Sequence, residues 1–177
     1  TKTELEDETV QLIKTYTEDA NEDIKLIDDA GNTSIVNIKV VANVNDNITS
    51  TTLKVLEDEL VIKGISLNTT VTKFKNNINA EMEYQVLNKK GTELTENDNV
   101  GTGCQVKMQN GKTYTIIVWG DLNGDGKISL TELARVSKIY AKKVTPSDLE
   151  KSAIDINMNG KIDLSELAAI SKMYAKK

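Results

Sequence analysis

The chain contains no histidine, and its 177 residues include a single cysteine, Cys104. Histidine is the commonest general base in enzymes and the commonest zinc ligand, so its absence excludes His-based catalytic triads and Cys/His metal clusters. A lone cysteine cannot form an internal disulfide. Aromatic residues make up only 4% of the chain, which argues against a stacking surface for sugars, with Trp119 as the sharpest exception. These absences disfavour an enzyme.

Long apolar runs and an excess of positive charge are also missing. No run approaches the roughly 20 apolar residues of a membrane span. The chain has 22 Lys and Arg against 27 Asp and Glu, for a formal charge of −5, so nucleic acid is a poor candidate partner. With 38% hydrophobic residues the chain should fold. Because it begins with Thr1 instead of Met, we expect Thr1 to be a cut end, of a chain either processed or excised from a longer one.

An internal repeat occupies the C-terminal third of the chain. The segment 121–143 recurs 34 residues later as 155–177, and 15 of the 23 aligned positions are identical. In each copy a polar loop is followed by apolar residues at helical spacing, which predicts two equivalent helices that each bury one stripe. The stripe residues are Leu130, Leu133, Val136, Ile139 and Tyr140 in the first copy, and Leu164, Leu167, Ile170, Met173 and Tyr174 in the second. A short third helix is expected over about Pro146 to Ser152.

Both loops match the calcium-loop pattern D-x-[DN]-x-[DN]-G-x5-E. The pattern fits calcium because six to eight oxygen ligands must converge from alternate side chains, a carbonyl and a final bidentate carboxylate. The candidate ligands of the first loop are Asp121, Asn123, Asp125, Lys127 (by its carbonyl), Ser129 and Glu132. Those of the second are Asp155, Asn157, Asn159, Lys161 (by its carbonyl), Asp163 and Glu166.

Chance does not explain these two loops. From the composition of the chain, roughly 0.002 matches to the pattern are expected, and two occur at equivalent places of the repeat. We therefore predict two Ca²⁺ ions, with Mg²⁺ less suited to such a loop. Since each loop gathers three carboxylates and each helix is marginal alone, calcium should fold this region.

The sequence before the repeat predicts strands. We expect strands over Leu60–Ile65, Glu83–Leu87, Gly103–Met108 and Lys112–Trp119, with a hairpin turn at Asn110-Gly111 and a short helix over Val71–Ile78. The fold class is therefore α+β, with mostly-β modules at the N-terminal side followed by an all-α duplicated calcium-loop-helix unit. We divide the chain into an unassigned segment 1–57, a small α+β domain 58–119 and the repeat unit 120–177.

The first 57 residues carry no recognisable chemistry. An acidic amphipathic stretch over Glu4–Tyr16 suggests a helix, and Asp23–Asp28 and Ser34–Asn43 suggest two strands joined by a turn. The polar residues Asn45–Thr52 are expected to form a loop or linker. This segment either belongs to the small α+β domain 58–119 or is the remnant of an enzyme or adhesin whose main body is missing.

The motifs of residues 120–177 resemble those of a type I dockerin, a calcium-dependent module of clostridial cell-surface and cellulosomal proteins. The strand-like TIIVWG enters the first loop where an ordinary EF-hand has a helix. Residues 58–119 are similar to the small X module that often precedes such dockerins, through Phe74 and the runs 64–66, 69–71, 100–103 and 114–116. The resemblance implies a non-catalytic, secreted or cell-surface protein that binds a cohesin domain of a scaffold protein.

The resemblance also implies which residues contact the partner. Either helix can face the cohesin, because the two are related by a pseudo-two-fold axis. Carried over, the contacts are Leu130, Thr131, Ser137, Lys138 and Lys142, or alternatively Leu164, Ser165, Ser171, Lys172 and Lys176. The family often has two hydroxyl residues where this chain has Leu-Thr and Leu-Ser. Two alternatives remain open for these residues: the two leucines pack in the core, and the lysines lie at solvated helix ends. For the whole unit the alternative is a calcium-stabilised structural module that clasps its own neighbouring domain without a cohesin partner.

Overall fold

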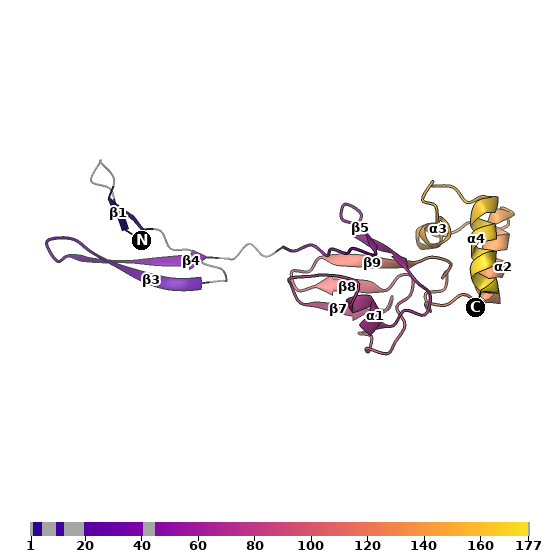
Figure 1. Ribbon diagram of the computed structural model, residues 1–177, viewed down its shortest axis with the longest axis horizontal. Coiled ribbons are helices and arrows are strands. Elements are labelled where there is room, and N and C mark those ends of the chain that lie inside the picture. The colour runs from indigo at the N-terminus through magenta and orange to yellow at the C-terminus, as the bar shows by residue number, and fades with distance from the viewer. Residues whose placement is uncertain (1, 5–9, 13–19, 41–44, 177) are drawn as a thin grey trace. The chain divides into compact units, whose positions relative to one another are not determined.

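The computed structural model describes residues 2–4, 10–12, 20–40 and 45–176. The chain divides into two compact units, Thr1–Val44 and Asn45–Lys177, which are described separately. The α+β class is confirmed, with strands toward the N-terminus and helices toward the C-terminus (Figure 1).

The N-terminal unit consists of two antiparallel hairpins. The first pairs β1 (Lys2–Glu4) with β2 (Val10–Leu12), and the second pairs β3 (Ala20–Ile27) with β4 (Thr33–Val40). The expected strand pair is confirmed within the described residues, whereas 41–43 lie outside them. The helix expected over Glu4–Tyr16 is wrong where the chain is described, because strand pairing satisfies the backbone there and short apolar patterns do not distinguish the two structures. Residues 5–9 and 13–16 lie outside the described residues.

A five-stranded mixed sheet forms the first part of the second unit, which we call the sheet module (residues 45–119). Its strands are β5 (Lys54–Leu56), β6 (Val61–Ile65), β7 (Tyr84–Leu87), β8 (Gln105–Met108) and β9 (Thr113–Val118), in the order β5-β6-β9-β8-β7. Only the β6–β9 pair is parallel. The hairpin predicted at Asn110-Gly111 joins β8 to β9, and α1 (Val71–Lys75) is shorter than the expected helix.

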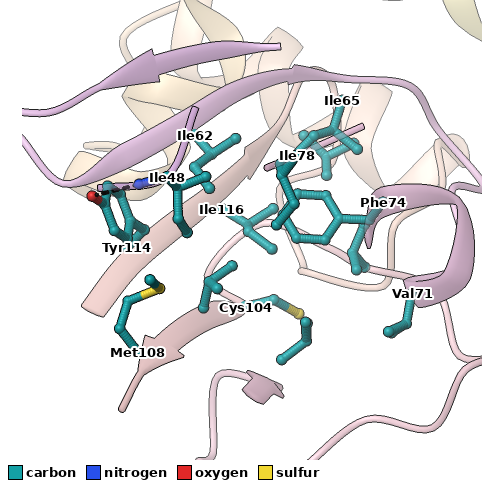
Figure 2. Close-up of a cluster of buried hydrophobic side chains, with 14 residues drawn as sticks. Ile48, Ile62, Ile65, Val71, Phe74, Ile78, Cys104, Met108, Tyr114 and Ile116 are labelled. Carbon is teal, nitrogen blue, oxygen red and sulfur yellow. Dashed lines mark hydrogen bonds between the residues drawn. The ribbon is translucent and has the colours of Figure 1, made fainter. Parts of the chain in front are cut away.

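The core of the sheet module is apolar and closely packed. Figure 2 shows the Phe74 ring, carried by α1, beside Ile78 and Ile116. Phe74 and Ile116 are fully buried. Thr70 caps the helix that presents this ring, because its hydroxyl accepts the N–H of Lys73. The central strand β9 is buried on both faces, since Ile117 is covered as well and α3 (Asp148–Ile154) packs against this strand.

Residues 45–57 pack onto this sheet. Ile48 is buried, and its N–H donates to the hydroxyl of Tyr114 (3.2 Å). That hydroxyl also lies 2.8 Å from the carboxylate oxygens of Glu57, which is ion-paired with Lys112. Since β5 pairs with β6, the stretch that the sequence left unassigned contributes an edge strand and a core residue.

Three helices make up the remainder, which we call the helical segment (residues 120–176). They are α2 (Leu130–Tyr140), α3 (Asp148–Ile154) and α4 (Leu164–Ala175), and α2 and α4 lie side by side (Figure 1). Their shared core contains Val136, Ile139 and Ile170. The described helices include none that is both long and apolar enough to cross a bilayer.

The expected apolar stripe needs correction. Leu130, Leu164 and Tyr140 are exposed, at 66%, 63% and 41%. Three residues of an α-helix turn about 300°, so residues spaced three apart shift by about 60° around the helix at each step. After the three steps from Leu130 to Ile139 the two side chains lie on opposite sides of α2. The two leucines therefore lie outside the core of the helical segment.

The linking helix begins later than predicted. It spans Asp148–Ile154 instead of Pro146 to Ser152, because Ser147 is its N-cap and closes a capping box with Glu150. Glu150 also binds Arg135 of α2 through two hydrogen bonds, Nε to Oε1 at 2.7 Å and Nη2 to Oε2 at 3.1 Å. The second copy of the repeat has Ala169 in place of this arginine, so α4 has no equivalent side chain to pair with Glu150.

Candidate functional site

The first loop is organised around the carboxylate of Asp121, which is fully buried. Its Oδ1 accepts the N–H of Gly124 (2.7 Å) and Asp125 (3.2 Å), and its Oδ2 accepts the N–H of Gly126 (2.9 Å). A fourth donor comes from outside the loop, since the N–H of Thr102 lies 2.8 Å from Oδ2. The loop therefore winds around its first acidic side chain.

The next two candidate ligands turn their oxygens toward the same loop. Asn123 Oδ1 accepts the N–H of Asp125 (2.9 Å), and Asp125 Oδ1 accepts the N–H of Lys127 (2.8 Å). Gly126, which follows Asp125, reverses the chain with a φ of +73°, a conformation that residues with a Cβ rarely adopt. The sequence pattern thus produces the closed turn that it predicted.

The loop ends in the capping box of α2. Glu132 is 1% exposed, and its Oε2 accepts hydrogen bonds from the N–H (2.8 Å) and the hydroxyl of Ser129. Its Oε1 is buried with no hydrogen-bond partner among the described residues. An unsatisfied carboxylate oxygen in a buried position is unfavourable unless a cation or a donor compensates it.

The second loop repeats this winding. Asp155 accepts the N–H of Asn159 (Oδ1, 3.0 Å) and Gly160 (Oδ2, 2.9 Å), and Gly160 has a φ of +76°. Asn157 and Asn159 accept the N–H two residues on, at 3.0 and 2.8 Å.

The closing carboxylate of the second loop, Glu166, is also buried. Its Oε2 accepts the N–H of the N-cap Asp163 (3.0 Å). Its Oε1 accepts the Asn157 amide (2.6 Å) and the Ser165 hydroxyl (3.0 Å) instead of remaining without a partner. The two closing glutamates therefore occupy equivalent positions with different partners.

The electrostatics of the loops favour a cation. Burial raises the pKa of Asp121 despite the amide hydrogen bonds that it accepts. The hydrogen bonds from Ser165 lower the pKa of Asp163. A buried carboxylate with few compensating charges gains most from a bound positive ion.

The donor set fits calcium when oxygens other than carboxylates are included. In the described part of the chain, no three acidic, histidine or cysteine side chains lie close enough to hold a metal ion by themselves. The amide, hydroxyl and carbonyl oxygens of the pattern would therefore have to complete the shell, which is the hard oxygen set that calcium prefers. Glu132, with its unpartnered oxygen, is the residue that most needs such an ion.

The residues expected to contact a partner lie mainly on the surface. The exposed ones are Thr131, Ser137, Lys138, Lys142, Ser165, Lys172 and Lys176, together with Leu130 and Leu164. Ser171 is half-buried. Ser137 donates to the carbonyl of Leu133 (2.8 Å), and the Ser165 hydroxyl lies 2.8 Å from Oδ1 of the N-cap Asp163, so these hydroxyls already have partners in their own helix or at its N-cap.

Sequence reasoning missed the sheet-module residues that touch the first loop. Thr102 donates to Asp121, Asn68 donates its N–H to the carbonyl of Gly126 (2.8 Å), and Lys89 donates to the carbonyl of Asn123 (2.6 Å). The fold alone brings these residues to the loop. Asn68 and Lys89 lie more than 30 residues away from their loop partners in the sequence, and they use a backbone N–H and the side chain of a surface lysine. No local motif marks them.

Comparison with known families supports the identification of the loops. The family model of the dockerin type I domain matches residues 119–173. No curated protein and no solved structure matches the chain. The match covers the whole of the first loop and α2, and the second loop with most of α4. The resemblance of the C-terminal segment to a type I dockerin is thereby confirmed, whereas the X-module resemblance of residues 58–119 stays a prediction.

Proposed function

We propose that this chain is the docking part of a secreted bacterial protein and that its dockerin attaches that protein to a cohesin domain of a scaffold or cell-surface protein. Type I dockerins in general bind cohesins in a calcium-dependent way and are not catalytic. The match to that family over residues 119–173 therefore supports the docking role of the segment. The partner, the face used and the extracellular location are parts of the proposal.

The observation that carries the proposal is the pair of exposed leucines. Leu130 and Leu164 are the first residues of α2 and α4, and they are 66% and 63% exposed. Equivalent large apolar side chains held in solvent directly after each calcium loop serve no purpose in the core. They suit the centre of an interface, with Thr131, Lys138 and Lys172 as polar surroundings.

Calcium would hold these leucines in place. In each loop the candidate ligands are Asp, Asn and Glu side chains, together with Ser129 in the first loop, Asp163 in the second and one backbone carbonyl per loop. Each closing glutamate, Glu132 or Glu166, sits in the first turn of the helix that begins with the leucine. Binding of the ion at that carboxylate would fix the helix start and hence the leucine beside it.

The test measures by calorimetry whether the calcium-loaded chain binds any of a panel of cohesin domains. Leu130→Ala and Leu164→Ala should each leave binding nearly intact if either face suffices, and the double variant should lose it. Ile35→Ala is the matched control, since Ile35 lies in the N-terminal unit and is 68% exposed. Full binding by the double leucine variant would refute the proposed surface. Loss of binding on changing only Thr131 and Lys138 would refute the use of two alternative faces.

A second candidate is a structural module that clasps its own neighbour. The hydrogen bonds from Thr102, Asn68 and Lys89 to the first loop favour it, because they join the dockerin to the sheet module within one chain. This reading predicts that no cohesin of the source organism binds, while calcium still raises the thermal stability of the chain.

A further inference from the structure

The two calcium loops differ in their surroundings. Asp121 of the first loop accepts one of its four hydrogen bonds from Thr102 of the sheet module. Asp155, its equivalent, accepts hydrogen bonds only from Asn159 and Gly160 of its own loop within the described residues. A group from outside a metal site that binds a ligand side chain fixes that ligand's orientation.

Backbone contacts reinforce this difference. A Cβ added to Gly101 would clash with the carbonyl of Gly124 and lie 2.9 Å from Asp121 Oδ2. A Cβ on Gly124 would lie 2.6 Å from the carbonyl oxygen of Thr102, and one on Gly126 would lie 2.5 Å from that of Val100. The sheet-module segment 99–103 and the first loop therefore meet main chain to main chain, with no room for side chains.

Among the described residues, no main chain crowds the corresponding glycine of the second loop. Gly160 has no atom within 4 Å of an added Cβ. At the position equivalent to Gly124 the second loop has Met158, which adopts the same left-handed conformation (φ +61° against +87°). The second loop thus holds a Cβ where the first loop has no room for one, and the Met158 sulfur lies 3.3 Å from Lys54 Nζ.

We infer that the segment 99–103 is a positioning element of the first calcium site, with Thr102 orienting Asp121. The first loop then binds calcium more tightly and releases it more slowly than the second. The second loop and α4, which follows it in the sequence, then become ordered or disordered as the calcium concentration rises or falls. This inference rests on the proposed calcium-dependent function and adds that the two sites differ in calcium affinity and in release rate.

The test uses the full chain with one loop disabled at a time. Glu166→Gln leaves only the first site and Glu132→Gln only the second, and calcium binding to each is measured by calorimetry. We expect the first site to bind more tightly. Adding Gly101→Ala should weaken it by about 10- to 100-fold, the usual effect of losing an outer-shell partner, and change the second site less than about twofold.

A milder pair guards against simple unfolding by Gly101→Ala. Lys89→Ala removes the hydrogen bond to the Asn123 carbonyl and should weaken the first site by about threefold. Lys90→Ala, the next residue in the same exposed turn, makes the same change of charge and should leave both sites unaltered. A general loss of stability would weaken both sites, so only an effect confined to the first supports the inference.

The outcomes separate this inference from the function on which it rests. Equal affinities of the two sites, or equal responses of both to Gly101→Ala and Lys89→Ala, would overturn the inference and leave calcium-dependent docking intact. Absence of calcium binding in both single-site chains would overturn both.

Discussion

The ion pair between Arg135 and Glu150 ties α3 to α2, and its removal gives a pH-dependent prediction. The pKa of Glu150 is lowered to about 2, first by the hydrogen bond from Arg135 and then by those from Ser147. A depressed folded-state pKa stabilises the protein above the unfolded-state value near 4.5. That stabilisation is lost as the pH falls from about 4.5 toward 2.

The magnitude follows from the geometry. A shift of this size corresponds to at most about 3 kcal/mol. The Arg135 side chain is 36% exposed, so solvent screening reduces the contribution of the pair. We therefore expect Glu150→Gln to lower the free energy of unfolding by about 1 kcal/mol at pH 7, where the carboxylate is ionised in both states.

The assay is urea unfolding of the wild type and Glu150→Gln, followed by far-UV circular dichroism at pH 7, 5, 4 and 3. The difference between the two should be constant from pH 7 to pH 5 and fall by roughly half or more by pH 3. Protonation of the calcium-loop carboxylates affects both proteins alike and cancels in the difference. Asp148→Asn serves as the control, because Asp148 is 98% exposed in its pair with Lys151 and should change stability little at any pH. A Glu150→Gln effect that persists undiminished at pH 3 would refute the reasoning.

Three other predictions concern the sheet module and the loops. Tyr114→Phe should lower the free energy of unfolding by about 1–2 kcal/mol, because it leaves the N–H of buried Ile48 without its acceptor; Tyr84→Phe, measured by the same denaturation, should change it by less than about half that amount. Met158→Gly should raise the thermal midpoint of the apo chain, because it relieves a left-handed backbone (φ +61°), worth up to about 1 kcal/mol, at a half-buried position whose side chain contacts a flexible lysine, Lys54; an unchanged or lower midpoint would contradict this. Removing calcium with a chelator should reduce the ellipticity at 222 nm, since α2 and α4, at 11 and 12 residues, are marginal without their loops; unchanged helicity would show that packing alone maintains them.

Local patterns predicted the elements that local physics determines. The Asn110-Gly111 turn, the runs that became β6, β7, β8 and β9, and the winding of both loops follow from turn chemistry, alternation and ligand spacing. The calcium-loop pattern also pointed to the dockerin family, because calcium coordination requires oxygen ligands at this spacing.

What the sequence did not predict depends on contacts between distant residues. Ile48 lies in a polar stretch, and only the hydroxyl of Tyr114 and the sheet core explain its burial. The exposure of Leu130 depends on which side of α2 the partner helix α4 covers, a matter that periodicity alone leaves open. The hydrogen bond from Thr102 to Asp121 joins a backbone amide to a side chain 19 residues away, and no motif encodes it.

The most direct test of the central claim is a crystal structure of the chain grown in excess calcium, with anomalous scattering used to locate the metal. The account predicts two calcium peaks, one bound by Asp121, Asp125 and Glu132 and the other by Asp155, Asp163 and Glu166. Density for water alone in both loops would contradict it.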